Sequence, residues 1–148
     1  MKLTLQRVTQ IKRDSIFKLS TDIEGFSKLM PKYFKSLIIT NSNNSDFFVL
    51  EKISFLGKPM MVKTKHVILP LSTHEIHILS GPLKYSTFHE IYEESRYGTS
   101  ITIHVNLQFN GMAKFLLIFN IFLKYKIKKI MDEFIKSCEI YQFSVDSN

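Results

Sequence analysis

The sequence predicts an α+β fold, a curved antiparallel sheet of about seven strands wrapped around a long C-terminal helix, with two short helices after the first strand. Three observations lead to this prediction. The 148 residues are enough for one hydrophobic core, so we expect a single domain over residues 1–148. Strand-like blocks follow one another at hairpin spacing up to residue 109. After residue 112 the apolar residues recur every three or four positions, which is helical spacing.

The first 31 residues predict one strand and two short helices. Residues 2–12 alternate apolar and polar side chains, as a half-buried strand does. Polar residues at 14–15 can cap a first short helix, and those at 21–22 can cap a second, which Pro31 ends.

Six further strands are predicted from blocks rich in β-branched and aromatic residues. Turn residues, mostly Gly, Pro, Asn and Ser, separate the blocks. Because the connections are short, we expect an antiparallel meander. The blocks are residues 33–41, 46–56, 60–69, 74–80, 84–94 and 99–109.

The last element is predicted to be one continuous helix over residues 112–143. Its apolar stripe consists of Leu116, Phe119, Leu123, Ile127, Ile130, Phe134, Cys138 and Tyr141. A sheet that curls around this helix without closing against it leaves space between the two, and that space is the natural ligand site.

Composition and charge exclude several classes of protein. Hydrophobic residues make up 45% and charged residues 22%, which indicates a folded chain. The single cysteine, Cys138, excludes an internal disulfide and a cysteine zinc cluster, and on an apolar helix stripe its thiol is expected to be inert. No phosphate-binding loop, secretory segment or membrane-spanning run of about 20 apolar residues is seen, so we expect a cytoplasmic protein.

The formal net charge of +7 comes from the first half of the chain. A basic protein can bind nucleic acid or anionic lipid, or can simply be soluble. The chain has seventeen Lys but only three Arg, and arginine provides most base contacts in proteins that bind nucleic acid. Nucleic acid or a ribosome is therefore a less favoured partner than a lipophilic molecule.

Strand alternation selects candidate polar groups inside the pocket. Lys63 and Lys65 are expected to face solvent, which turns His66 inward. Glu51 lies on an otherwise apolar strand face, and His74 shares its face with apolar residues 76 and 78.

The strand 84–94 is ambiguous. Phe88, Glu90 and Tyr92 share one face, and His89 lies on the other, so the pattern does not decide which face lines the cavity.

Glu51, His66 and Glu90 are therefore candidate catalytic acid/base residues. Apolar surroundings favour the neutral forms of such groups, which lets pockets exchange protons near neutral pH. They could orient a ligand hydroxyl or carbonyl, or transfer a proton in a cyclisation. Alternatively, the two carboxylates face water beside lysines and His66 has a structural role.

Metal binding is not expected. His74 and His77 are three residues apart, and on a strand such residues point to opposite faces. A site assembled across strands from His66, His89 and His104 is geometrically conceivable but has no sequence signature. We expect no metal and no other cofactor.

Residues 115–123 are apolar around most of a helix circumference, so something must cover a second apolar side. A lipophilic ligand, a partner in a homodimer or a membrane surface next to the lysines of residues 124–129 could do so. The two short helices could also pack there.

Residues 15–36, SIFKLSTDIEGFSKLMPKYFKS, resemble the pattern that follows the first strand in the START-like polyketide cyclase/dehydrase (SRPBCC) superfamily. SGPLK at residues 80–84 is similar to the S-G-P-F-K turn of its coenzyme-Q-binding branch. MDEF at residues 131–134 resembles the M-x-x-A-F run of the last helix in that branch. The resemblance covers the whole chain and implies a helix-grip fold.

The resemblance also implies a ligand, namely a lipid, an isoprenoid quinone or a polyketide-like compound. We therefore expect a carrier or sensor that binds a lipophilic molecule between sheet and helix. The alternatives are a cyclase or dehydratase that uses an inward acid/base residue, and a ribosome- or RNA-associated regulator. The candidate ligand-binding residues are Phe55, His66, Ile78, Phe88, Glu90, Tyr92, Ile103, Phe119, Leu123 and Ile130.

Overall fold

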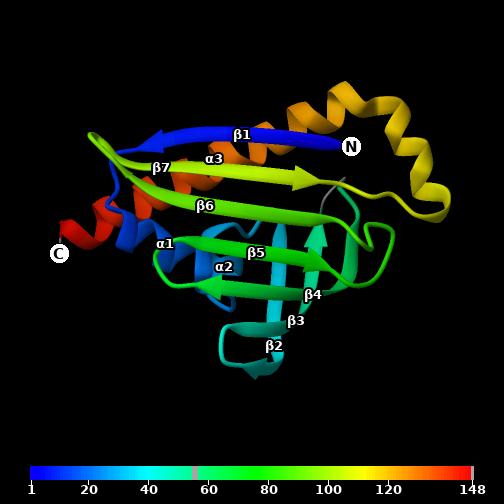
Figure 1. The fold of residues 1–148 in the computed structure, drawn as a ribbon, viewed down its shortest axis with the longest axis horizontal. Helices are drawn as coiled ribbons and strands as arrows, with labels where there is room; N and C mark the ends of the chain where they lie inside the picture. The colour runs from blue at the N-terminus through cyan, green and yellow to red at the C-terminus, as the bar shows by residue number, and fades with distance from the viewer. Residues whose placement is uncertain (55–56, 148) are drawn as a thin grey trace.

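The structure, a computed structural model, describes residues 1–54 and 57–147 (Figure 1). Strand β1 (Lys2–Thr9) is followed by two short helices, α1 (Arg13–Thr21) and α2 (Phe26–Leu29). Six strands come next: β2 (Phe34–Asn43), β3 (Asp46–Ser54), β4 (Pro59–Leu69), β5 (Thr73–Ile78), β6 (Thr87–Ser95) and β7 (Gly98–Asn106). The chain ends in a 3-10 segment, η1 (Gly111–Phe119), and the long helix α3 (Asn120–Asp146).

The seven strands form one antiparallel sheet in the order β1-β7-β6-β5-β4-β3-β2. Strands β2 to β7 are a meander of consecutive hairpins, as the sequence predicts. Strand β1 joins the far edge by pairing with β7 from Lys2↔Asn106 to Thr9↔Thr99. The amino group of Met1 donates to the carbonyl oxygen of Leu107 at 2.7 Å and extends this contact.

Helix α3 crosses one face of the sheet (Figure 1) and buries a stripe against it. The stripe includes Leu123, Ile127, Met131, Phe134 and Cys138, at helical spacing of three or four residues. Helix α2 packs beside it, because the Phe26 ring lies 5.8 Å from that of Phe134. The predicted helix-grip architecture is confirmed.

Strand β6 begins at Thr87 and not at residue 84. The preceding residues form turns, in which the Lys84 amide donates to the Gly81 carbonyl and the Ser86 amide to the Leu83 carbonyl. The backbone of residues 84–86 is therefore not extended as a strand requires.

The predicted continuous helix over residues 112–143 is wrong in its first part. Residues 111–119 form the 3-10 segment η1, and none of them is buried. Only Ala113 and Leu116 pack against the core, and they are three residues apart, which is one 3-10 turn. In Figure 1 this segment, in yellow, extends past the end of the sheet.

Among the described residues, no helix combines the length and the apolar character needed to cross a bilayer.

Candidate ligand-binding cavity

A cavity of about 180 Å³ lies between the sheet and α3. Its walls come from α2, from most of the strands and from α3, and the apolar side chains include Phe26, Val62, Ile78, Phe88 and Ile130. No lysine or arginine of the described chain lines it. The cavity therefore offers apolar contact on most sides.

Most of the cavity's polar groups lie on the four neighbouring strands β3 to β6. Glu51 lies on β3, His66 on β4, His74 on β5 and Glu90 on β6. The register brings them together. His74 pairs with Ile68 of β4, which lies two residues after His66 on the same strand face, and His74 also pairs with Glu90 of β6. Alternation along each strand turns these side chains to the face that α3 covers.

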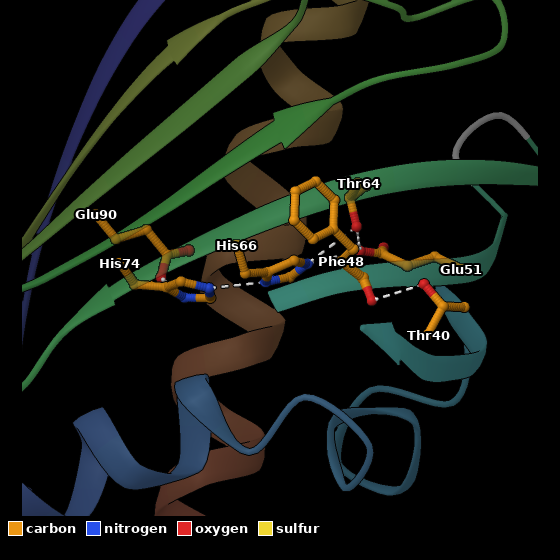
Figure 2. A network of polar contacts seen from close by, with 7 residues as sticks. All are labelled: Thr40, Phe48, Glu51, Thr64, His66, His74 and Glu90. Atoms are coloured by element: carbon orange, nitrogen blue, oxygen red, sulfur yellow. Dashed lines mark hydrogen bonds and ion pairs between the residues drawn. The ribbon is translucent and has the colours of Figure 1, made fainter. Parts of the chain in front are cut away.

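The four side chains form a linear chain of hydrogen bonds (Figure 2). His66 Nε2 lies 2.8 Å from Glu51 Oε1, and His66 Nδ1 lies 2.9 Å from His74 Nε2. His74 Nδ1 lies 3.1 Å from Glu90 Oε2. The Thr64 hydroxyl also donates to Glu51. Glu51, Thr64, His66 and His74 are all buried, and Glu90 is 16% exposed in its side chain. We call these residues the polar chain.

Proton counting constrains the charge of the polar chain. Each of its three links, Glu51–His66, His66–His74 and His74–Glu90, needs one proton. Two neutral imidazoles supply only two, so a third proton resides on an imidazole or on a carboxyl group. Two carboxylates and one imidazolium, or any equivalent distribution, leave one net negative charge at the cavity wall.

The histidine nitrogens are all used within the polar chain. By contrast, no donor among the described residues contacts Glu51 Oε2 or Glu90 Oε1. Within the polar chain, these two carboxyl oxygens are the atoms left to accept a hydrogen bond from a ligand.

Tyr92 holds one end of the polar chain in place. Its hydroxyl donates to Glu90 Oε2 at 2.8 Å, and its ring packs edge-on against Phe17 at 5.2 Å. Burial raises the pKa of Tyr92 well above its usual value of 10.0, and the nearby Glu90 carboxylate raises it further. The phenol therefore stays a hydrogen-bond donor to Glu90.

Most of the residues selected from the sequence meet at this cavity. The undecided face of β6 is resolved, because Phe88 and Glu90 line the cavity, whereas His89 lies on the outer face near His104. The selected residues that line the cavity are Glu51, His66, Ile78, Phe88, Glu90, Ile103 and Ile130.

Three selected residues that the structure describes, Tyr92, Phe119 and Leu123, do not line the cavity. Tyr92 and Leu123 are buried in the core behind it. Phe119 lies in η1, is 57% exposed and is not part of the cavity wall. Phe55 lies outside the described residues.

Two members of the polar chain, Thr64 and His74, were not selected as site residues from the sequence. The sequence does indicate that both face inward, because strand alternation places Thr64 on the same face as His66, and His74 on the same face as the apolar residues 76 and 78. The register between β4 and β5, which brings His74 next to His66, could not be predicted from the sequence.

The conceivable metal site from His66, His89 and His104 is not formed. His66 faces the cavity, whereas His89 and His104 face outward with ring centres 6.1 Å apart. Within the described part of the chain, no cluster of three or more His, Cys, Asp or Glu residues could hold a metal ion.

Cys138 is expected to react slowly in the folded protein. Burial, with smaller contributions from the charges of Glu139 and Glu90, raises the pKa of its thiol to about 12. At pH 8 the scarcity of thiolate alone slows reaction with a disulfide reagent by about a thousandfold relative to an ordinary thiol. Stopped-flow thiol titration of native and urea-unfolded protein checks this, and similar rates in the two states would contradict the buried position.

No family model and no curated protein matches the sequence. Solved structures do match. TTHA0849 from Thermus thermophilus superposes with a TM-score of 0.80 at 10% identity, covering 95% of this chain and 99% of that one. The Zhui aromatase/cyclase from Streptomyces sp. R1128 superposes with a TM-score of 0.75 at 9% identity, covering 94% and 93%. Ara h 8.0201 superposes with a TM-score of 0.72 at 18% identity, covering 97% and 98%.

These likenesses extend over nearly the whole chain and show the fold. The chain has the helix-grip fold that the sequence resemblance implied. The narrower likeness to the coenzyme-Q-binding branch stays a prediction.

Proposed function

We propose that this protein binds a lipophilic small molecule in the cavity between the sheet and α3, as a carrier or a sensor. The supporting observation is a largely apolar cavity whose polar groups are concentrated in one hydrogen-bonded chain. Burial of apolar ligand surface, at about 25 cal/mol per Å², would supply affinity. The polar chain would orient the ligand.

The charge of the polar chain narrows the class of ligand. Its unpaired atoms are carboxyl oxygens of Glu51 and Glu90, and no lysine or arginine of the described chain lines the cavity. A ligand head that donates a hydrogen bond fits these acceptors, whereas an anionic head would be desolvated beside negative charge. A lipid alcohol, an isoprenoid hydroquinone or a polyketide-like phenol meets this requirement, and a fatty acid does not.

Organic extraction of the purified protein, followed by mass spectrometry against a matched blank, tests the proposal directly. A stoichiometric hydroxyl-bearing lipophilic compound is the supporting result. A blank extract combined with no binding of apolar probes to the cavity would overturn the proposal.

Decanol is expected to bind at least about tenfold more tightly than decanoate at pH 7.5, because only decanoate brings an anionic head to the carboxylates. Displacement of a fluorescent apolar probe from the cavity measures both affinities. Glu51→Gln should reduce the preference, because it removes a charge at the cavity wall. Glu75→Gln, on the outer face, should leave it unchanged. Tighter binding of decanoate by the wild type would contradict the assigned ligand class.

An acid/base enzyme is the second candidate, favoured by the two carboxyl groups that reach the cavity from a chain of proton-exchanging residues. The same experiment separates the candidates. A carrier returns the extracted compound unchanged after prolonged incubation, whereas a cyclase or dehydratase converts it. Turnover that Glu90→Gln abolishes, with ligand binding retained, would establish the enzyme.

A further inference from the structure

We infer that η1 and the first turns of α3 form a docking surface for an anionic lipid bilayer. The surface consists of Met112, Phe115, Leu117, Ile118, Phe119, Ile121 and Phe122, together with the lysines described below. We call it the docking segment. The inference is independent of the cavity's ligand, because it rests on different residues.

The docking segment exposes an unusual amount of apolar surface. Met112 is 87% exposed, Ile118 76% and Ile121 86%. Large contiguous apolar patches are rare on the free surface of soluble proteins and indicate an interaction site. The segment also extends beyond the end of the sheet (Figure 1), so a flat partner can reach it.

Charge identifies the partner. Residues 111–131 contain five lysines, Lys114, Lys124, Lys126, Lys128 and Lys129, and no acidic residue. None of these lysines forms an ion pair with another described residue. Lysines beside an apolar helix face are the pattern of proteins that insert at the surface of anionic membranes.

Other occupants fit less well. A second copy of the chain would bring two such lysine clusters together without opposing carboxylates, which is repulsive. RNA would neutralise the lysines but would leave the aliphatic side chains of Leu117, Ile118 and Ile121 without a partner, because bases stack on aromatic or guanidinium groups.

Docking would also position the cavity. Ile127 and Ile130 line the cavity and follow the docking segment directly along α3. A bilayer bound at the segment would therefore lie at the end of the protein where α3 begins, next to the part of the helix that lines the cavity.

Sedimentation of the purified protein with vesicles tests the inference. We expect binding to vesicles of phosphatidylcholine and phosphatidylserine that is at least about tenfold tighter than to phosphatidylcholine alone and that weakens with added salt. The double variant Ile118→Ser, Ile121→Ser should lose at least about tenfold in affinity for the anionic vesicles. The double variant Ile140→Ser, Val145→Ser removes exposed apolar residues from the other end of α3 and should bind as the wild type does.

The substituted residues are exposed, so both variants are expected to keep the wild-type melting temperature, which thermal denaturation checks. Absence of binding to anionic vesicles would overturn the inference. So would equal loss in the two double variants, a stable dimer whose formation protects the segment, or tighter binding to RNA than to the vesicles.

Discussion

Replacing His66 with alanine is expected to lower the free energy of unfolding by about 3–5 kcal/mol, because it removes the centre of a buried polar chain. Glu51 would lose its imidazole partner at 2.8 Å, and His74 Nε2 would lose its partner at 2.9 Å. Both remaining groups are buried, so each is left with part of its desolvation cost uncompensated. Urea unfolding followed by far-UV circular dichroism measures the difference.

His77→Ala is the matched control for this prediction. His77 lies on the outer face of β5, is 38% exposed in its side chain and contacts Glu75 at 3.1 Å. Its replacement is expected to change stability by no more than about 0.5 kcal/mol. A loss below about 1 kcal/mol for His66→Ala would show that the polar chain does not depend on its central imidazole.

Replacing Leu123 with alanine is expected to cost about 2–5 kcal/mol of stability, because it empties space in a packed core. The Leu123 side chain is fully buried between α3 and the sheet. Chemical denaturation again provides the measurement.

Ile121→Ala, two residues earlier in the same helix, is the control. Ile121 is 86% exposed, so its replacement removes a similar number of carbon atoms without opening a cavity. We expect a change within about 0.5 kcal/mol. Equal effects at the two positions would mean that the helix presents a different face to the sheet.

The inward-facing residues of β4 could be predicted from the sequence because a strand repeats every two residues. Lysines at positions 63 and 65 identify the outer face, so His66 had to lie inside. Strand β6 gave no such signal, since polar and aromatic residues occupy both of its faces. Its orientation is set by the pairing of His74 with Glu90, and that long-range register is not written in the local pattern.

The start of the last helix shows a second limit. Apolar spacing at residues 116, 119 and 123 predicts an α-helix, and from Asn120 onward an α-helix forms. In η1, however, most of the apolar side chains have no core to pack against, so the spacing that marks a buried stripe further along α3 marks an exposed surface here. Periodicity identifies which residues are apolar, but tertiary packing decides which of them are covered.

The position of β1 at the far edge of the sheet sets the order in which the protein can be assembled. Strands β2 to β7 pair with their neighbours in the sequence, so they can form while the chain is being synthesised. Among the described strands, β1 pairs with β7 alone, and the contact of Met1 with Leu107 spans 106 residues. Of these seven strands, β1 is synthesised first but is among the last to pair, and the edge of β7 stays open to pairing with other chains until then.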